Sequence, residues 1–251
     1  MALYCAAFSP TGTSLRGAWA MASALGEAHL LDVPPPPAPE QVFTPQDLVV
    51  FGAPVYGGRV FQGALERLSP LRGQDTPCIV TVTYGNRDFD DALLELTRFC
   101  QELGFLPFAG AALVGEHTYG SIQVGRPDAE DLLQDRAFAL EAWEDFQAGW
   151  ESFSPPGNFP YKEGGKGGSF TPSTTQACTH CGLCVRQCPM QAIGEDCAAI
   201  DREKCIACFR CVKNCPVQAK GVFTPEYQSF AAAFSEKLKE PKENQYFLGR
   251  G

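Results

Sequence analysis

The sequence is short of positive charge and has no long apolar run. Its 251 residues include 20 Lys and Arg against 29 Asp and Glu, which gives a formal net charge of -9 at pH 7. An acidic chain is a poor ligand for nucleic acid or for an anionic membrane surface. No stretch reaches the roughly 18 apolar residues that a membrane-spanning helix needs, and no secretory signal is visible. We therefore expect no nucleic-acid partner and no membrane insertion.

Fingerprints of nucleotide binding are also scarce. The run GGKGGS at 164–169 is not a P-loop, because no Gly-Lys-Ser/Thr follows a glycine at the required spacing. No dinucleotide fingerprint is visible elsewhere in the sequence, which disfavours direct oxidation of NAD(P)H. Cysteine, by contrast, is abundant, with 12 residues.

Eight of the cysteines form two matching runs. CTHCGLCVRQCP at 178–189 and CIACFRCVKNCP at 205–216 both read C-x2-C-x2-C-x3-C-P. The halves also agree at a valine, a glutamine and an alanine, which indicates an internal repeat of one structural unit. Paired C-x2-C motifs also bind zinc, and cysteine-rich chains also form disulfides. Zinc, however, does not call for the third cysteine or the trailing Cys-Pro, and disulfides suit a secreted chain.

This pattern resembles the bacterial-type ferredoxins that hold two [4Fe-4S] clusters, in which the fourth cysteine of each run ligates the other cluster. The resemblance implies one cluster on Cys178, Cys181, Cys184 and Cys215. It implies a second cluster on Cys205, Cys208, Cys211 and Cys188. Among the remaining cysteines we expect Cys5, Cys78 and Cys100 to be core thiols, and Cys197 has no assigned role. Clusters and free thiols favour a reducing, cytoplasmic location.

The first 151 residues alternate short apolar runs with helical patterns. Strands are expected at 2–8, 28–33, 48–52, 78–83 and 110–115. Helices are expected at 15–25, 60–71, 91–103 and 127–150. This alternation predicts an α/β fold with a doubly wound parallel sheet. Ligands of such sheets bind at the carboxyl ends of the strands.

Three loops that follow predicted strands have the composition of a ligand site. The first, SPTGTS at 9–14, offers hydroxyl groups and a glycine just before a helix, which suits a phosphate. A plain helix N-cap is the alternative, because Ser and Thr are common caps. The loops at 54–59 and 84–87 are Gly-rich with one tyrosine each. Such loops suit a planar heteroaromatic ring, although each tyrosine alone is more typical of ordinary loop packing.

Together these loops resemble the FMN loops of flavodoxin-like proteins. The whole chain resembles fusion flavoproteins that join an N-terminal flavodoxin-like domain to a C-terminal two-[4Fe-4S] ferredoxin. The resemblance implies a five-stranded parallel sheet of order 2-1-3-4-5, a small α+β ferredoxin-like domain, FMN and two [4Fe-4S] clusters. The residues implied for the FMN phosphate are Ser9, Thr11, Gly12, Thr13 and Ser14. Those implied for the ring are Pro54, Val55, Tyr56 and Gly57 on one side, and Tyr84, Gly85, Asn86 and Arg87 on the other.

The predicted domains are a flavodoxin-like domain at 1–151, a linker at 152–175, a ferredoxin domain at 176–222, and a C-terminal helix and tail at 223–251. The second half of the linker is Gly-rich, and we expect it to be flexible. The C-terminal helix, expected at 225–239, has an apolar face that we expect to pack on the chain's own domains.

Clusters transfer one electron and a flavin transfers one or two, so the chain is predicted to relay electrons between redox partner proteins. Two other functions stay open. One is an FMN-dependent reductase fed by its ferredoxin domain, with His117 and Tyr119 as proton donors. The other is an electron-transfer module of a larger redox complex. The sequence is also compatible with a homodimer.

Overall fold

The structure is a computed structural model that describes residues 1–149 and 153–249. It divides into two compact units. The N-terminal unit comprises Met1–His117, Gln123–Gly165 and Pro241–Gly251. The cysteine-rich unit comprises Thr118–Ile122 and Lys166–Glu240. The segment 241–251 belongs with the N-terminal unit, and the loop 118–122 belongs with the cysteine-rich unit.

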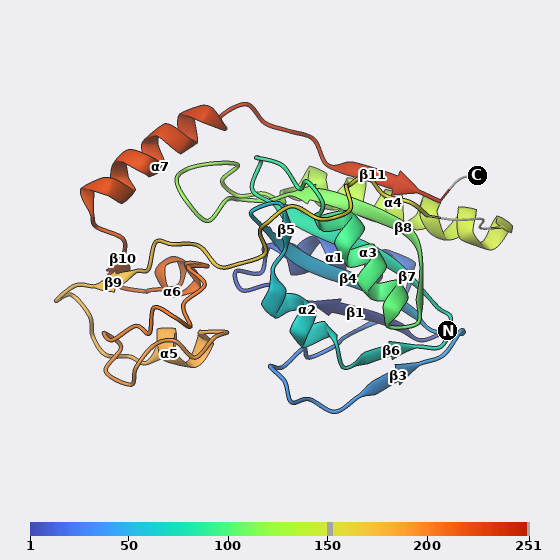
Figure 1. The fold of residues 1–251 in the computed structure, drawn as a ribbon, viewed down its shortest axis with the longest axis horizontal. Coiled ribbons are helices and arrows are strands. Elements are labelled where there is room, and N and C mark those ends of the chain that lie inside the picture. The colour runs from blue at the N-terminus through green and yellow to red at the C-terminus, as the bar shows by residue number, and fades with distance from the viewer. Residues whose placement is uncertain (150–152, 250–251) are drawn as a thin grey trace. The chain divides into compact units, whose positions relative to one another are not determined.

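A parallel sheet forms the centre of the N-terminal unit (Figure 1). Its parallel strands are β1 (Leu3–Ala7), β2 (Ala28–Leu30), β4 (Leu48–Tyr56), β7 (Thr76–Tyr84) and β8 (Phe105–Val114). They pair in the order β2-β1-β4-β7-β8, which is the flavodoxin-like order 2-1-3-4-5. The predicted fold class is therefore confirmed. All nine residues of β7 are buried, as expected for a central strand covered on both faces.

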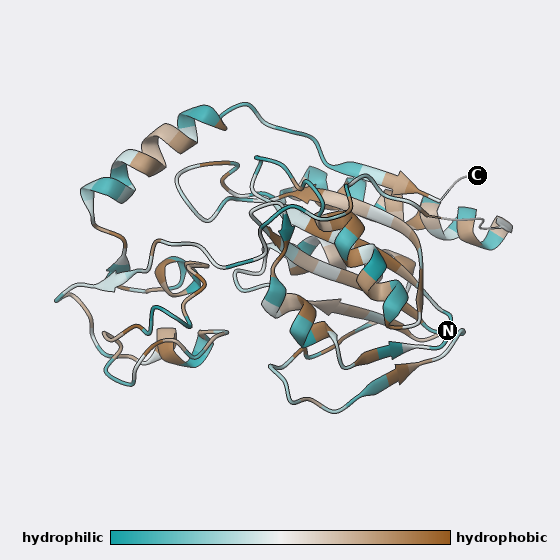
Figure 2. Ribbon diagram, in the orientation of Figure 1, coloured by the Kyte–Doolittle hydropathy of each residue, from teal (hydrophilic) through white to brown (hydrophobic). Residues whose placement is uncertain are grey.

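Four helices cover the sheet. They are α1 (Thr13–Leu25), α2 (Gln62–Leu68), α3 (Ala92–Glu102) and α4 (Ala129–Gly149). Helices α1 and α4 pack together on one face over a core that includes Met21, Phe108 and Phe138, while α2 and α3 lie on the other face (Figure 1). Figure 2 shows the apolar residues concentrated on the central strands, with mixed colouring on the helices. Cys5, Cys78 and Cys100 are fully buried, and burial raises the pKa of Cys5 to about 12, as expected for core thiols.

Several elements differ in length from their prediction. The fifth parallel strand, β8, begins at Phe105 and not at 110. Its proline is accommodated at an irregularity, since Cys78 pairs with Pro107 and Ile79 pairs with Ala109. A bulge is one of the few places where a strand tolerates proline. Helix α2 is shorter than predicted because the short strand β5 (Arg59–Val60) forms a hairpin with β4.

Besides β5, three strands of the N-terminal unit were not predicted from the sequence. Strands β3 (Gln41–Phe43) and β6 (Leu71–Gly73) pair in parallel as a separate two-stranded sheet. Strand β11 (Gln245–Leu248) pairs antiparallel with β8. The chain end therefore adds an edge strand to the sheet that the first half of the chain builds.

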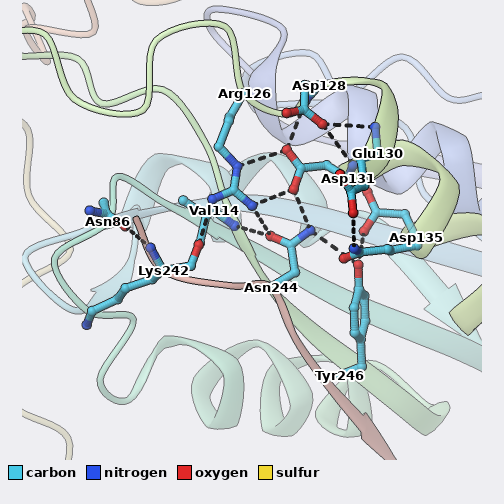
Figure 3. A network of polar contacts seen from close by, with 11 residues as sticks. Asn86, Val114, Arg126, Asp128, Glu130, Asp131, Asp135, Lys242, Asn244 and Tyr246 are labelled. Carbon is cyan, nitrogen blue, oxygen red and sulfur yellow. Dashed lines mark hydrogen bonds and ion pairs between the residues drawn. The ribbon is translucent and has the colours of Figure 1, made fainter. Parts of the chain in front are cut away.

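A network of polar side chains fastens β11 to its neighbours (Figure 3). The Asn244 amide oxygen accepts a hydrogen bond of 2.8 Å from the Val114 backbone N–H. Its amide nitrogen donates to Asp131 Oδ1 at 3.2 Å, and Asp131 is also ion-paired with Arg126. From β11 itself, the Tyr246 hydroxyl donates to Asp135 Oδ1 on α4 at 2.8 Å. Because Asp135 is fully buried, this bond links β11 to the interior of the unit.

The cysteine-rich unit repeats one backbone conformation. Its elements are β9 (Ser173–Thr174), α5 (Leu183–Gln187), α6 (Arg210–Lys213), β10 (Lys220–Gly221) and α7 (Pro225–Lys237). Strands β9 and β10 pair antiparallel. Positions in the two cysteine runs correspond at a constant offset, as Cys178 does to Cys205. Gln191 and Gln218, which correspond, have left-handed φ angles of 50° and 52°. The internal repeat seen in the sequence is thus a repeat of structure.

In the described part of the chain, no helix is both long enough and apolar enough to cross a membrane.

The buried carboxyl of Asp135 predicts a pH-dependent stability. Burial raises its pKa to about 7, whereas an unfolded Asp titrates near 3.9. Between these values the folded chain holds a proton that the unfolded chain has lost. The free energy of unfolding should therefore fall by roughly 1.4 kcal/mol per pH unit as the pH rises from about 4 to about 7. Asp135→Asn should remove this part of the slope.

Urea unfolding at about pH 5.5 and about pH 8, followed by tryptophan fluorescence, measures this slope. All 3 tryptophans (Trp19, Trp143 and Trp150) fall in the sequence of the N-terminal unit. An unchanged pH dependence in the variant would contradict the prediction.

Candidate cofactor sites

Two cavities in the cysteine-rich unit are lined by the two predicted sets of four cysteines. The first cavity is bordered by Cys178, Cys181, Cys184 and Cys215. The second is bordered by Cys188, Cys205, Cys208 and Cys211. In each cavity three cysteines come from one run and the fourth comes from the other run. Cys197 and Cys211 also border the first cavity.

Backbone N–H groups point at several of these sulfurs. The Ala192 N–H donates to Cys188 Sγ at 3.4 Å, and the Ala219 N–H donates to Cys215 Sγ at 3.2 Å. These two bonds are equivalent in the repeat. The left-handed glutamine that precedes each alanine turns the chain back toward the cysteine. Such bonds favour the thiolate form, which is the form that binds metal.

The sulfurs of the second cavity are the more strongly buried. Burial raises the pKa of Cys208 to about 11 and that of Cys211 to about 12. Cys215, in the first set, shows the opposite direction. Burial acts to raise its pKa, but the N–H groups that follow it, from Ala219 among others, lower it below the ordinary value. Buried thiolates need positive charge beside them, which a bound iron–sulfur core supplies.

The geometry differs from that of a single-ion site. A zinc ion needs four ligands that converge to about 2.3 Å from one point. Across residues 1–149 and 153–249, no three His, Cys, Asp or Glu side chains converge in a way that would hold one metal ion. The eight cysteines border the two cavities.

The loop after β1 has the geometry of an anion site. Gly12 adopts a left-handed φ of 86°, which lets the chain turn into α1 at Thr13. The first N–H groups of α1 have no partner within the helix and face the loop. Ser9 Oγ accepts a hydrogen bond of 3.0 Å from the Leu15 N–H, so Ser9 also acts as a capping residue. Thr11 and Thr13 place their hydroxyl oxygens 3.2 Å apart, and Ser14 is buried.

The second loop is a tight hairpin. Strand β4 turns into β5 through Gly57 and Gly58, whose φ angles are 63° and 87°. Two left-handed residues suit the type I′ turn of a two-residue hairpin. Pro54, Val55 and Tyr56 are half-buried, and Gly57 is exposed. The Tyr56 carbonyl accepts the Gly165 N–H at 2.8 Å, so the chain's own later segment occupies part of this loop.

The third loop, at 84–87, is fixed by contacts with the interior of the N-terminal unit. The Tyr84 ring is buried and packs against Phe89 at 5.6 Å between centroids, so its side chain serves the core. Asn86 is buried with a left-handed φ of 64°, and its Oδ1 accepts the Lys242 N–H at 2.9 Å. Arg87 is ion-paired with Asp90. Gly85 is half-buried and Arg87 is exposed.

The predicted linker is not a free segment. Residues up to 165 pack on the N-terminal unit, where the Asp91 carboxylate accepts the N–H groups of Asn158 and Lys162, both at 2.8 Å. Residues from 166 belong to the cysteine-rich unit, where the Gly168 N–H donates to the Ile206 carbonyl at 3.1 Å. A Cβ on Gly164 would lie 2.8 Å from the Gly57 oxygen. These glycines allow close backbone approach, which composition alone does not distinguish from flexibility.

The two predicted proton donors fall in different units. The His117 ring lies against the backbone of Gly85, where a Cβ would meet His117 Cδ2 at 2.1 Å. His117 is therefore at the carboxyl edge of the sheet, beside the third loop. Tyr119 belongs to the cysteine-rich unit. Aromatic rings surround it within 5.2–6.1 Å, and they are Phe170, Phe209, Tyr227 and Phe230.

Burial raises the Tyr119 pKa to about 12, which suits a packing residue better than a proton donor. Two of its neighbours, Tyr227 and Phe230, lie on α7, so part of the apolar face of α7 packs on the cysteine-rich unit.

A family model matches the cysteine-rich part of the chain. Residues 173–216 match a family model described as a 4Fe-4S dicluster domain. This match supports iron–sulfur clusters in this segment and a role in electron transfer. Solved structures similar to the chain include a flavodoxin from the domain Archaea, at 10% sequence identity and a TM-score of 0.37. That similarity covers 59% of this chain and 99% of the flavodoxin. No curated protein sequence matches the chain.

Packing around Tyr119 predicts how its variants behave. Tyr119→Phe keeps the ring and should leave the stability of the cysteine-rich unit and any substrate turnover nearly unchanged. Tyr119→Ala removes the ring from its aromatic neighbours and should destabilise that unit by about 2 kcal/mol or more. Loss of cluster absorbance during urea unfolding measures this difference. A large loss of turnover in Tyr119→Phe, with unchanged stability, would instead restore the proton-donor role.

Proposed function

We propose that this chain is an electron-transfer flavoprotein that holds two [4Fe-4S] clusters in its cysteine-rich unit and FMN at the edge of its parallel sheet. The observation that carries the proposal is that each of the two cavities is bordered by one predicted set of four cysteines, three of one run and the fourth of the other, with Cys211 bordering both cavities. When bound, the clusters transfer single electrons and FMN transfers one or two. The chain would thus couple one-electron and two-electron chemistry.

The residues around each cavity have separable tasks. The cysteines bind iron, and the N–H groups of Ala192 and Ala219 stabilise the thiolate charge of Cys188 and Cys215. Apolar residues such as Ile193 and Ile206 border the second cavity. They limit access of water, which tunes the potential of a cluster.

For the flavin, we propose that the 9–14 loop binds the phosphate and that the loops at 54–57 and 84–87 flank the ring. Three features support this. The loops follow parallel strands that end at the same edge of the sheet, the first loop begins a helix with a left-handed glycine, and the Thr11 and Thr13 hydroxyl oxygens lie 3.2 Å apart. Pro10 removes one backbone donor, so phosphate binding depends more on the Thr11, Thr13 and Ser14 hydroxyls.

We propose external redox proteins, in a reducing cytoplasm, as donor and acceptor. A second candidate function is reduction of a small substrate over the flavin, and the position of His117 against Gly85 favours it. His117→Ala should then abolish turnover with dithionite as the electron source while FMN content stays unchanged. If the chain only carries electrons, the same variant should exchange electrons with partner proteins at the wild-type rate.

Metal analysis tests the cysteine assignment. The anaerobically purified chain should contain about eight iron and eight sulfide per chain. Cys208→Ser should lose about half of this iron, because one cluster is left with three thiolates. The EPR signal of the remaining cluster should persist.

A matched control is Cys100→Ser, which changes a buried cysteine of the N-terminal unit and should keep the full iron content. Zinc in place of iron, or an iron content unaffected by Cys208→Ser, would refute the assignment.

The phosphate loop is tested by flavin affinity. Thr11→Val removes an exposed hydroxyl and should weaken FMN binding about tenfold, as expected for the loss of a hydrogen bond to a charged group. Thr11→Ser keeps the hydroxyl and should bind nearly as the wild type does. Ser23→Ala, at the far end of α1, is the control. Riboflavin, which lacks the phosphate, should bind equally to all four proteins, and an equal loss for riboflavin would argue against a phosphate role.

A further inference from the structure

The two cavities have their cationic side chains at different positions of the repeat. Arg210, which is half-buried, borders the second cavity where Leu183 borders the first. A buried cation lies at the other position. Ile193 and Lys220 occupy corresponding places in the repeat, each directly after the alanine whose N–H donates to a cysteine sulfur. Ile193 borders the second cavity, and Lys220 borders the first. The repeat therefore places a long cationic side chain in the wall of one cavity and an aliphatic side chain in the same place in the other.

The Lys220 ammonium is buried, with the residue 4% exposed. Its Nζ donates to the Cys197 carbonyl, which also accepts the Thr174 hydroxyl at 3.1 Å. This partner is neutral, so the hydrogen bond fixes the position of the ammonium without cancelling its charge. Asp196, whose pKa Lys220 helps to lower, is fully exposed, and water screens its charge.

Lys220 is one of the residues that border the first cavity, together with Cys178, Cys184 and Cys215. Reduction of a cluster adds one electron and hence one negative charge, and no bond is made or broken. A fixed buried cation in the cavity wall stabilises that added charge, because little water lies between them to screen it.

We propose that Lys220 gives the cluster held by Cys178, Cys181, Cys184 and Cys215 a higher reduction potential than the cluster held by Cys188, Cys205, Cys208 and Cys211. This inference rests on the proposed function, since it requires both clusters. A higher potential at the first cluster would order the two clusters. Electron transfer from the second cluster to the first would be favourable, and an electron in the cysteine-rich unit would reside on the first.

A redox titration of the full chain, followed by visible absorbance and EPR, tests the order. The wild type should show two separate reduction steps. Lys220→Met keeps the length of the side chain and removes its charge. It should lower the higher of the two reduction potentials by at least 59 mV, which is a tenfold change in the equilibrium constant for one electron. Lys220→Arg should keep the wild-type separation. Ile193→Lys places a positive charge in the wall of the second cavity. It should raise the lower of the two reduction potentials and so reduce the difference between them.

Iron analysis distinguishes a failure of this inference from a failure of the proposed function. With about eight iron per chain in every variant, an unchanged upper step in Lys220→Met overturns the role of Lys220 and leaves the proposed function intact. If Lys220→Met loses iron, Ile193→Lys provides the test instead. An unchanged lower reduction potential in Ile193→Lys would then overturn the inference. A wild-type chain without iron overturns the proposed function itself.

Discussion

The crossing of one cysteine from each run into the cavity of the other is the constraint on which the cysteine-rich unit depends. This unit has only short helices and two-residue strands around its cavities, and the buried apolar residues beside them are few, among them Ala192, Ile193, Ile206 and Ala219. A group bound in either cavity would tie residues of one half to residues of the other. Folding and metal binding are then a single process, as in other small metal-binding domains.

The N-terminal unit is stabilised differently, by a sheet buried on both faces. Its ligand edge is not a set of free loops, because segments from later in the chain hold them. Asp91 binds the backbone at 158–162, and Asn86 binds Lys242. Arg59, beside the second loop, forms a paired contact with Glu95. Loops fixed in this way are pre-organised, which lowers the entropy that a ligand must remove when it binds.

Much of this architecture follows from local pattern. Apolar runs such as 48–52 predicted the parallel strands, and the spacing of the eight cysteines indicated the internal repeat, because each signal lies within one element or one repeat. The strand order and the two cysteine sets were implied by the resemblance to known families. What was missed depends on distant partners. Strand β11 is a short run of mixed polarity that becomes a strand by pairing with β8. The glycines near 164–168 were read as flexible, yet they pack against backbone. Tyr119 lies two residues from His117, but packing assigns it to the other unit.

The antiparallel strand β11 has a consequence for how the molecule is made. Its partner β8 ends at Val114, but the ribosome adds Gln245–Leu248 only after the entire cysteine-rich unit has been synthesised. Until then one margin of the sheet has unpaired backbone groups, the kind of edge that invites association with other chains. The margin of the sheet at β8 therefore stays exposed until the last segment of the unit has been synthesised.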